Sequence, residues 1–297
     1  MSVGRLRNNI FFLGLRLAVA VALVAVAAAC DLANAESPDI ANRRASERRD
    51  FTNGEISEGF LKIALRAELQ LGKSSERVRK FDEPVRIFIE SKAQPDRRAE
   101  IAEVIADIRR RIDHLDVSIT DDREEANFVI SLVADREIAA TIRARYGSSR
   151  ASQIEKSLAP QCLSGIGKDK QFRVRRAEVI LPVDAGDFTF YDCAYEEILQ
   201  GLGAINDDSS VPWTMFNDDV QMGFFDIYDQ YLLNILYDPR IRPGMTKSEV
   251  ERLMPDVLAA ARAFVTSRNS PNHTSRDTHG ASTSRIAAPG ADEAQSN

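Results

Sequence analysis

The chain has 297 residues, of which 44% are hydrophobic and 28% are charged, and its formal net charge is −6. That composition is typical of a soluble globular protein. Residues 1–35 hold three arginines and one aspartate, a charge of +2, so the remainder carries −8. An acidic chain disfavours nucleic acid as the main partner, because phosphate binding requires clustered Lys and Arg.

The first 35 residues are predicted to be a signal peptide. Three arginines accompany an unbroken apolar run over residues 17–29, which is shorter than the roughly 20 apolar residues of a membrane-spanning helix. Residues 33–35, Ala-Asn-Ala, then supply a small-x-small cleavage site. The protein is therefore expected to be exported to the periplasm or the cell envelope.

A second interpretation of this segment stays open. Residues 27–30, Ala-Ala-Ala-Cys, resemble the signal of a bacterial lipoprotein, in which the cysteine becomes the lipidated first residue. Cys30 is therefore the lipidation candidate, and a lipid anchor is the one membrane contact that we expect.

Residues 53–267 are predicted to form a single domain. The polar residues 36–52 indicate a linker, and residues 268–297, which have almost no apolar periodicity, indicate a disordered tail. Apolar residues at helical spacing predict helices over residues 56–71 and, after a cap at Asp96, up to residue 112. Runs rich in Val and Ile predict strands over residues 84–90, 117–119, 127–134 and 176–182.

The second half of this domain is predicted to be more helical. Residues 145–172, with their Gly, Ser and Lys content, are expected to form a long loop. One helix follows a possible cap at Asp187, a second is capped by Asp226 and covers residues 227–237, and a capping box at Thr246 opens a third. The order of helices and strands predicts the α/β (α+β) class with a mixed sheet.

Two cysteines remain once Cys30 is lipidated or cleaved off. Cys162 and Cys193 are expected to form a disulfide in an oxidising compartment. Such a bridge would close a loop of about 30 residues and stabilise the domain by roughly 3–4 kcal/mol. Two buried free thiols are the alternative.

The helix that contains Cys193 resembles the active-site helix of a zinc protease. Against the metalloprotease pattern His-Glu-x-x-His-x-Leu-Gly-x-x-His, the chain keeps Glu197 and a Leu-Gly pair. Glu196, Gln200 and Asn206 stand where the three histidines would lie. In such enzymes two ligands four residues apart share a helix face, and the glutamate after the first is the general base.

The resemblance continues after this helix. Met215 lies nine residues past Asn206, in Trp-Thr-Met-Phe, which resembles the methionine-containing turn (Met-turn) of metzincin and matrixin-type zinc metallopeptidases. Residues 229–237 resemble their closing helix. These similarities imply a zincin-like domain whose active-site-type helix has lost its histidines.

A further resemblance covers most of the exported part. It rests on residues 190–197 (Phe-Tyr-Asp-Cys-Ala-Tyr-Glu-Glu), 200–203 (Gln-Gly-Leu-Gly), 215–219 (Met-Phe-Asn-Asp-Asp) and 236–240 (Leu-Tyr-Asp-Pro-Arg). These phrases are similar to a proteobacterial envelope family catalogued as domain of unknown function family 2927, many of whose members are described as lipoproteins. The resemblance implies an envelope location and no established activity.

The substitutions at the histidine positions disfavour zinc. Glu196 can bind a metal, but the amides of Gln200 and Asn206 are poor zinc ligands. Oxygen ligands suit calcium, magnesium or manganese, and would bind tightly only if aspartates from the following loop joined them, among Asp207, Asp208, Asp218 and Asp219. We therefore assign no cofactor from the sequence, and leave a divalent cation open.

The function that these observations favour is a non-catalytic, metallopeptidase-like binding or assembly module with an envelope protein or peptide as partner. The alternative is a hydrolase or peptidase with an oxygen-ligated metal and Glu197 as its general base. A third interpretation makes Glu196, Glu197 and Gln200 the polar face of an ordinary capped helix.

Overall fold

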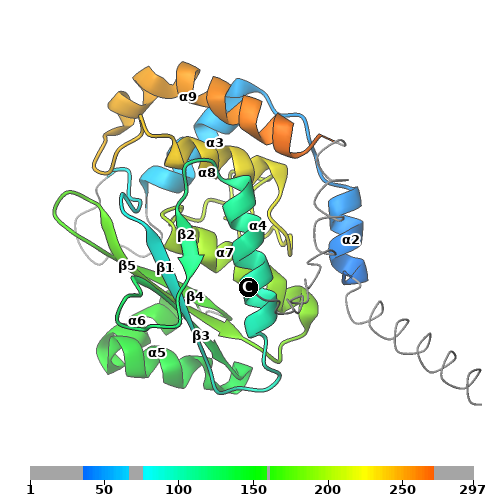
Figure 1. The fold of residues 1–297 in the computed structure, drawn as a ribbon, viewed down its shortest axis with the longest axis vertical. Helices are drawn as coiled ribbons and strands as arrows, with labels where there is room; N and C mark the ends of the chain where they lie inside the picture. Colours follow the sequence, from blue (N-terminus) through cyan, green and yellow to red (C-terminus); the bar gives the residue numbers. More distant parts are fainter. Residues whose placement is uncertain (1–35, 67–75, 159–160, 271–297) are drawn as a thin grey trace, which may run out of the picture. The chain divides into compact units, whose positions relative to one another are not determined.

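A computed structural model of the chain describes residues 36–66, 76–158 and 161–270 (Figure 1). The predicted signal peptide with Cys30 and most of the predicted tail lie outside these residues. The chain divides after Ser46 into two compact units. In the first, the helix α2 (Pro38–Ala45) occupies part of the predicted linker, with Pro38 at its first turn. Within the described ranges, no helix is both long and apolar enough to cross a membrane.

The second unit is built on a five-stranded mixed sheet, which confirms the predicted mixed α/β class. Its strands lie in the order β2 (Val117–Ile119), β1 (Val85–Ser91), β3 (Phe128–Val133), β5 (Val174–Pro182) and β4 (Leu163–Lys168). The first four are parallel, and β4 is antiparallel to β5. One row of apolar residues crosses the sheet: Ile119, Ile87, Phe128, Ala177 and Ile166. The zincin-like form of this fold stays a prediction.

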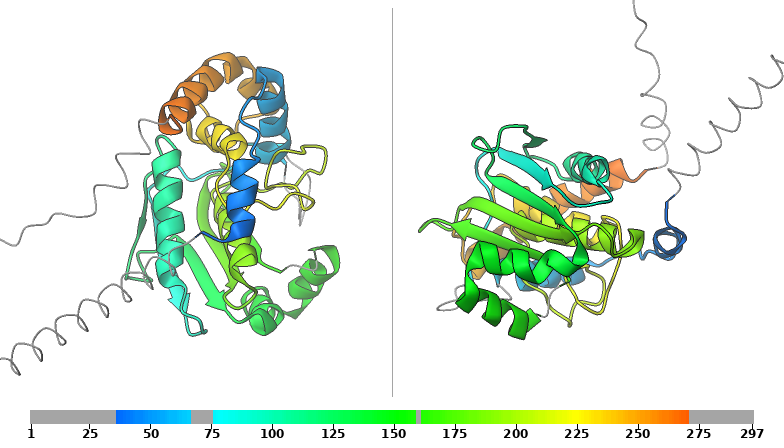
Figure 2. Two further views of the ribbon diagram at one scale, coloured as in Figure 1. Left: turned by 90° about the vertical axis from the view of Figure 1, so that its right-hand side faces the viewer. Right: turned by 90° about the horizontal axis from the view of Figure 1, so that it is seen from below.

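Helices cover both faces of the sheet (Figure 2). On one face, α5 (Ile138–Tyr146) and α6 (Ser148–Leu158) enclose a small apolar core with Leu163 and Ile180. On the other face, α7 (Asp187–Gly201) packs so closely that a Cβ at Gly201 would meet the ring of Phe128. The helix α4 (Arg98–Arg111) lies beside α7 on that face.

Residues 145–172 are not the long loop that the sequence predicts. They contain α6 and β4, separated by Cys162. Both elements have weak local patterns, because β4 includes Gly165 and Gly167 and α6 is mostly polar. The strand β4 is stabilised by pairing with β5, and α6 by the burial of Ala151 and Ile154.

Two predicted helix starts are shifted by a residue or two. The residue before α4 is Arg97, and the Asp96 side chain instead accepts a hydrogen bond from the Arg98 backbone N–H at 3.2 Å. Asp187 is the first residue of α7, after Gly186, whose φ of 94° is left-handed and favours glycine.

A second helical layer consists of α3 (Asn53–Leu65), α8 (Ile227–Tyr237) and α9 (Lys247–Arg268), which pack on one another (Figure 1). Every residue of α8 is buried. The predicted cap of α8 is confirmed, because the Asp226 side chain accepts from the N–H groups of Tyr228 and Asp229. The predicted capping box at Thr246 is also present, and α9 runs unbroken through Pro255.

Two buried cations close the C-terminal ends of helices in this layer. The Arg79 guanidinium donates to the carbonyl oxygens of Leu65 and Arg66 at the end of α3. The Lys80 ammonium donates to the carbonyl oxygens of Leu236 and Asp238 at the end of α8, at 2.7 and 3.2 Å. Cations are favoured there because the last carbonyls of a helix lack partners and carry its negative dipole end.

Candidate functional site

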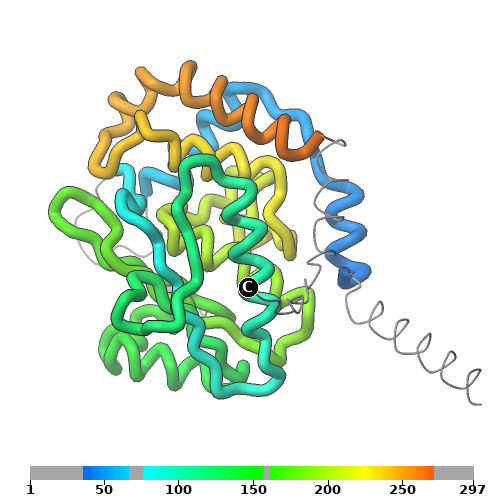
Figure 3. The backbone as a smooth tube through the Cα atoms, viewed as in Figure 1, coloured from blue at the N-terminus to red at the C-terminus, as the bar shows by residue number. Residues whose placement is uncertain are grey.

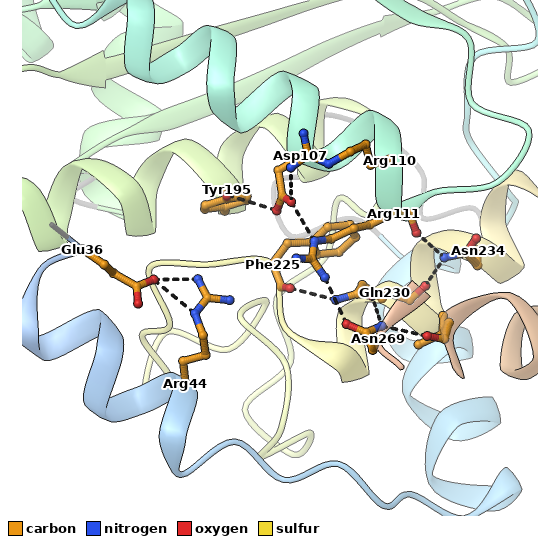
Figure 4. A network of polar contacts seen from close by, with 11 residues as sticks. Glu36, Arg44, Asp107, Arg110, Arg111, Tyr195, Phe225, Gln230, Asn234 and Asn269 are labelled. Carbon is orange, nitrogen blue, oxygen red and sulfur yellow. Dashed lines mark hydrogen bonds and ion pairs between the residues drawn. The ribbon is translucent and has the colours of Figure 1, made fainter. Parts of the chain in front are cut away.

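The helix α7 is held firmly by its neighbours. The predicted disulfide between Cys162 and Cys193 is present, with a Cα–Cα distance of 6.0 Å, and ties α7 to the start of β4. On another side, the Tyr195 hydroxyl donates to Asp107 of α4 at 3.2 Å (Figure 4). The network in that view continues through Arg111 and Asn269 to Gln230 of α8. The residues on α7 are therefore presented from a fixed support.

Between α7 and α8 the chain follows a long turn that we call the acidic loop, residues 204–225 (Figure 3). It contains four aspartates and neither Lys nor Arg. Polar side chains bind its backbone: Asp192 of α7 accepts from the N–H groups of Met222 and Gly223 at 2.7 and 3.0 Å. Within the loop, the amide of Asn217 donates to the carbonyl of Val211 at 3.0 Å.

The middle of the acidic loop also contacts residues just before α3. The ring of Trp213 lies 6.2 Å from that of Phe51, and the guanidinium of Arg48 stacks over Trp213 at 4.2 Å. A stacked cation and an aromatic edge contact both stabilise such an arrangement. The acidic loop is therefore anchored to α7 and to the segment before α3.

The acidic loop brings two of its aspartates to α7. Carboxylate oxygens of Glu196, Asp207 and Asp218 all lie within 4.8 Å of one another, an arrangement that could hold a metal ion. We call these three residues the carboxylate cluster. Glu196 and Asp207 are half-buried, and Asp218 is exposed. Two of the four loop aspartates that the sequence offers as extra ligands are thus the ones brought to Glu196.

The electrostatics of the carboxylate cluster are unfavourable without a counter-ion. Burial raises the pKa of the Glu196 carboxyl well above its usual value, and the negative charges of Glu197, Asp207, Asp192 and Asp218 raise it further. Like charges so close disfavour ionisation of all the members. A proton or a cation bound among these oxygens would relieve the repulsion.

The other two residues at histidine positions use their side-chain amides in hydrogen bonds to the protein. The Gln200 amide donates to the Asp207 carboxylate at 2.9 Å, and its oxygen accepts from the Ser164 hydroxyl of β4 at 2.8 Å. The Asn206 amide donates to the carbonyls of Lys62 and Asp207, both at 3.1 Å. Gln200 therefore orients a member of the carboxylate cluster, while Asn206 ties the loop to α3.

Glu197 and Met215 are both buried, with exposed fractions of 7% and 3%. Glu197 follows Glu196 directly on α7, so the two side chains diverge around the helix axis. The Met215 backbone N–H donates to the Asp229 carboxylate of α8 at 2.8 Å, which fixes the predicted Met-turn on that helix. The role of Glu197 as a general base stays a prediction.

Sequence reasoning did not single out Asp192 and Asp229, the carboxylates that hold the acidic loop. On the sequence, Asp192 is one polar residue of a helix and Asp229 an ordinary acid in a first helical turn. Acids in a first turn are common because they interact favourably with the helix dipole. In the sequence, Asp229 stands out only by its place in the largely apolar run Ile-Tyr-Asp-Gln-Tyr-Leu-Leu-Asn-Ile-Leu-Tyr. In the structure, all eleven residues of this run are buried.

The chemistry of the carboxylate cluster is that of a hard-cation site. Three carboxylate oxygens from two segments match the preference of calcium, magnesium and manganese for oxygen ligands. Thiolates and imidazoles, the ligands that zinc prefers, do not occur among its members. Asp218 is exposed, so solvent reaches the carboxylate cluster on that side.

Comparisons with known proteins give one match. The model of a family described as "Protein of unknown function (DUF2927)" matches residues 53–256. This stretch includes α7, the acidic loop, α8 and all five strands. No curated protein and no solved structure matches the chain.

Proposed function

The chain belongs to this family of proteins of unknown function, and we propose that it is an exported, non-catalytic binding module that takes a hard divalent cation. The carboxylate cluster would hold the cation, and the bound ion would complete the surface that a protein or peptide of the cell envelope recognises. The signal peptide that residues 1–35 predict would deliver the protein to the periplasm, or to the envelope with a lipid on Cys30.

The observation that carries this proposal is the convergence of Glu196, Asp207 and Asp218. Two of these side chains are half-buried, and the surrounding charges are negative, so the arrangement costs free energy unless a cation offsets it. The loop that brings them together is braced by hydrogen bonds to Asp192 and Gln200. A preformed site of this kind binds more tightly than a flexible one, because less ordering is lost on binding.

Zinc proteolysis receives less support from the same geometry. The amides of Gln200 and Asn206 donate hydrogen bonds to protein oxygens, which occupies them in positions where zinc proteases present imidazole nitrogens. The alternative function that one observation supports is a hydrolase with an oxygen-ligated metal. Glu197 lies next to Glu196, as a general base would lie next to a first ligand.

The test is thermal unfolding of chelator-treated protein with added calcium, magnesium, manganese or zinc. A cation at about 100 times its Kd should stabilise the protein by about 2.7 kcal/mol, which raises Tm by roughly 5–10 °C for a domain of this size. We expect the rise with a hard cation and its loss in Asp218→Asn. Asp219→Asn is the matched control, since it is the exposed neighbour outside the carboxylate cluster, and it should retain the rise.

Two results would contradict the proposal. The absence of a shift with every cation, or an equal loss in Asp218→Asn and Asp219→Asn, would remove the cation site. Peptide cleavage that requires the cation and disappears in Glu197→Gln would replace the binding module with the hydrolase.

A further inference from the structure

The N-terminal end of α8 contains two carboxyl groups that are almost completely buried. Asp226, the cap, is 1% exposed, and Asp229, in the first turn, is 0% exposed. Carboxyl groups are rarely buried unless each oxygen finds a donor or the group is neutral. The hydrogen-bond partners of these two carboxyl groups therefore determine how the start of α8 is held against its neighbours.

The Asp229 carboxylate uses both of its oxygens to hold the acidic loop. Its Oδ1 accepts from the Thr214 hydroxyl, and its Oδ2 accepts from the Met215 N–H at 2.8 Å. Both donors are buried. Asp229 is thus the ionised member, because an ionised carboxylate accepts only and can satisfy both donors.

Only one of the two carboxyl oxygens of Asp226 accepts hydrogen bonds from the helix. Its Oδ1 accepts from the N–H groups of Tyr228 and Asp229 at 2.8 and 3.1 Å. Among the described residues, no donor reaches its buried Oδ2. The Asp226 carboxyl nonetheless lies against Asp229, since its Oδ1 is 3.1 Å from the Asp229 backbone nitrogen, and each carboxyl affects the pKa of the other. Two carboxylates cannot donate to one another, so a hydrogen bond between them requires a proton on one.

We propose that Asp226 keeps its proton at neutral pH and donates it to Asp229, and that this shared proton locks the acidic loop onto α8. Loss of the proton would place two adjacent negative charges in the core. The two carboxylates would repel each other, and the bonds from Asp229 to Thr214 and Met215 would weaken as it moves away. The acidic loop would then loosen at alkaline pH.

The charged groups around the pair are mostly negative. The charge of Glu196 on α7 raises the pKa of Asp229. Tyr228, which lies between the two aspartates in the chain, also feels Glu55 and Glu58 of α3, and Glu47, which accepts from the Ile227 N–H, is paired with Arg49. Burial raises the pKa of both aspartates, that of Asp229 to about 6. An acid with a raised pKa in the folded state stabilises the fold at low pH and loses that contribution as the pH rises through the raised value.

The experiment follows Trp213, the chain's single tryptophan, which precedes Thr214 in the acidic loop. Its fluorescence and the Tm are measured from pH 6 to pH 9 in the presence of a chelator, so that the outcome is independent of the proposed cation. For the native chain we expect the Trp213 emission to change and the Tm to fall by at least about 2 °C across this range.

Asp226→Asn should reduce this pH dependence to the part that the carboxylate cluster contributes, because its amide retains the cap oxygen and supplies a permanent donor to Asp229. Asp226→Ser, which caps the helix without a second polar group, should show the loosened Trp213 emission already at pH 6. Asp121→Asn, an exposed control far from α8 in sequence, should follow the native profile.

The proposal is overturned if Asp226→Asn has the same pH profile as the native chain. It is also overturned if Asp226→Asn fails to fold or unfolds at a lower temperature than the native chain throughout the range. A Ser variant that matches the native chain at every pH would equally exclude the shared proton.

Discussion

The two ends of α8 are both buried and both hold ionisable side chains, yet their charges are met in different ways. At the C-terminal end, the single ammonium of Lys80 donates to two carbonyl oxygens, and the charge of Asp238 also attracts it. At the N-terminal end, Asp226 and Asp229 compete with each other and feel Glu196 on the neighbouring helix. Both ends follow the helix dipole, with acids at the start and a cation at the finish.

This difference in charge balance indicates that the Lys80 end of α8 is structural, whereas the Asp226/Asp229 end is part of a candidate functional region. At the Lys80 end, two carbonyl oxygens accept from the ammonium, and the negative charges of Asp238 and Asp82 offset its positive charge. The acidic end continues into the acidic loop and the carboxylate cluster, where negative charges accumulate beyond what the helix dipole can offset. Perturbed ionisable groups of this kind gather at functional sites.

The largest effect that we predict comes from Gly203, which lies where the end of α7 meets the segment of the buried cations. Its φ is 127°, and a Cβ there would collide with the carbonyl oxygen of Arg79. Gly203→Ala should lower the free energy of unfolding by about 4 kcal/mol, since backbone strain and overpacking add.

Gly186→Ala is the matched control for this change, because Gly186 at the start of α7 also has a left-handed φ but nothing lies within 4 Å of an added Cβ. It should cost only about 1 kcal/mol. Equal losses in the two variants, measured by denaturant unfolding, would show that α7 and the buried cations are not packed as described.

Removal of the ammonium at the structural end should have the next largest effect. Lys80→Met fills the same space but leaves the carbonyls of Leu236 and Asp238 without a donor, at a cost of about 2 kcal/mol at pH 7. Burial lowers the pKa of Lys80 to about 8. Above about pH 8 the folded chain releases the Lys80 proton while the unfolded chain still binds it. The stability of the native chain relative to Lys80→Met should therefore increase between about pH 8 and pH 10.

Denaturant unfolding at several pH values measures that difference. Lys247→Met, at an exposed position of α9, supplies the control and should show no pH-dependent difference. A gap between the native chain and Lys80→Met that narrows with rising pH would contradict the assignment of a buried, charged ammonium.

The smallest effect should have the opposite sign. Glu196→Gln removes one charge from the carboxylate cluster and, in a chelator at pH 8, should raise the free energy of unfolding by about 1 kcal/mol. Because the pKa of Glu196 is raised in the folded state, the native chain loses stability as the pH rises. The native chain and Glu196→Gln should therefore be equally stable near pH 4, where Glu196 is protonated.

Glu124→Gln, an exposed control, should leave the stability unchanged at both pH values. A loss of stability in Glu196→Gln at pH 8 would mean that the carboxylate makes favourable contacts, and the contrast between the two regions would fail.

Local patterns were enough to predict the elements that carry their own signals. The caps at Asp226 and Thr246 and the apolar runs of β1 and β3 lie entirely within short stretches of sequence. The disulfide was predictable from the pairing of the two cysteines that remain in a chain predicted to be exported. By contrast, β4 is stabilised by pairing with β5, and α6 by packing against α5 and Ile180. The glycines of β4 and the mostly polar residues of α6 carry no pattern that predicts these elements.

The candidate site was predictable in part for the same reason. Glu196 and the loop aspartates could be named as oxygen ligands from their chemistry alone. Which aspartates reach Glu196 depends on the path of the acidic loop, and that path is set by Asp192, Asn217 and Asp229 through backbone contacts. Such contacts have no spacing rule, so Asp207 and Asp218 could not be distinguished from Asp208 and Asp219.

The contacts of Trp213 have a consequence for where the folding unit begins. The family match starts at residue 53, whereas Phe51 and Arg48 pack on Trp213 and Glu47 accepts from the first N–H of α8. At the other end, Arg262, six residues beyond the match, donates to the Phe51 carbonyl. A chain trimmed to residues 53–256 would therefore lose residues 47–52, which pack on the acidic loop, and Arg262, which is hydrogen-bonded to them. The ring of Trp213 would then be exposed to water.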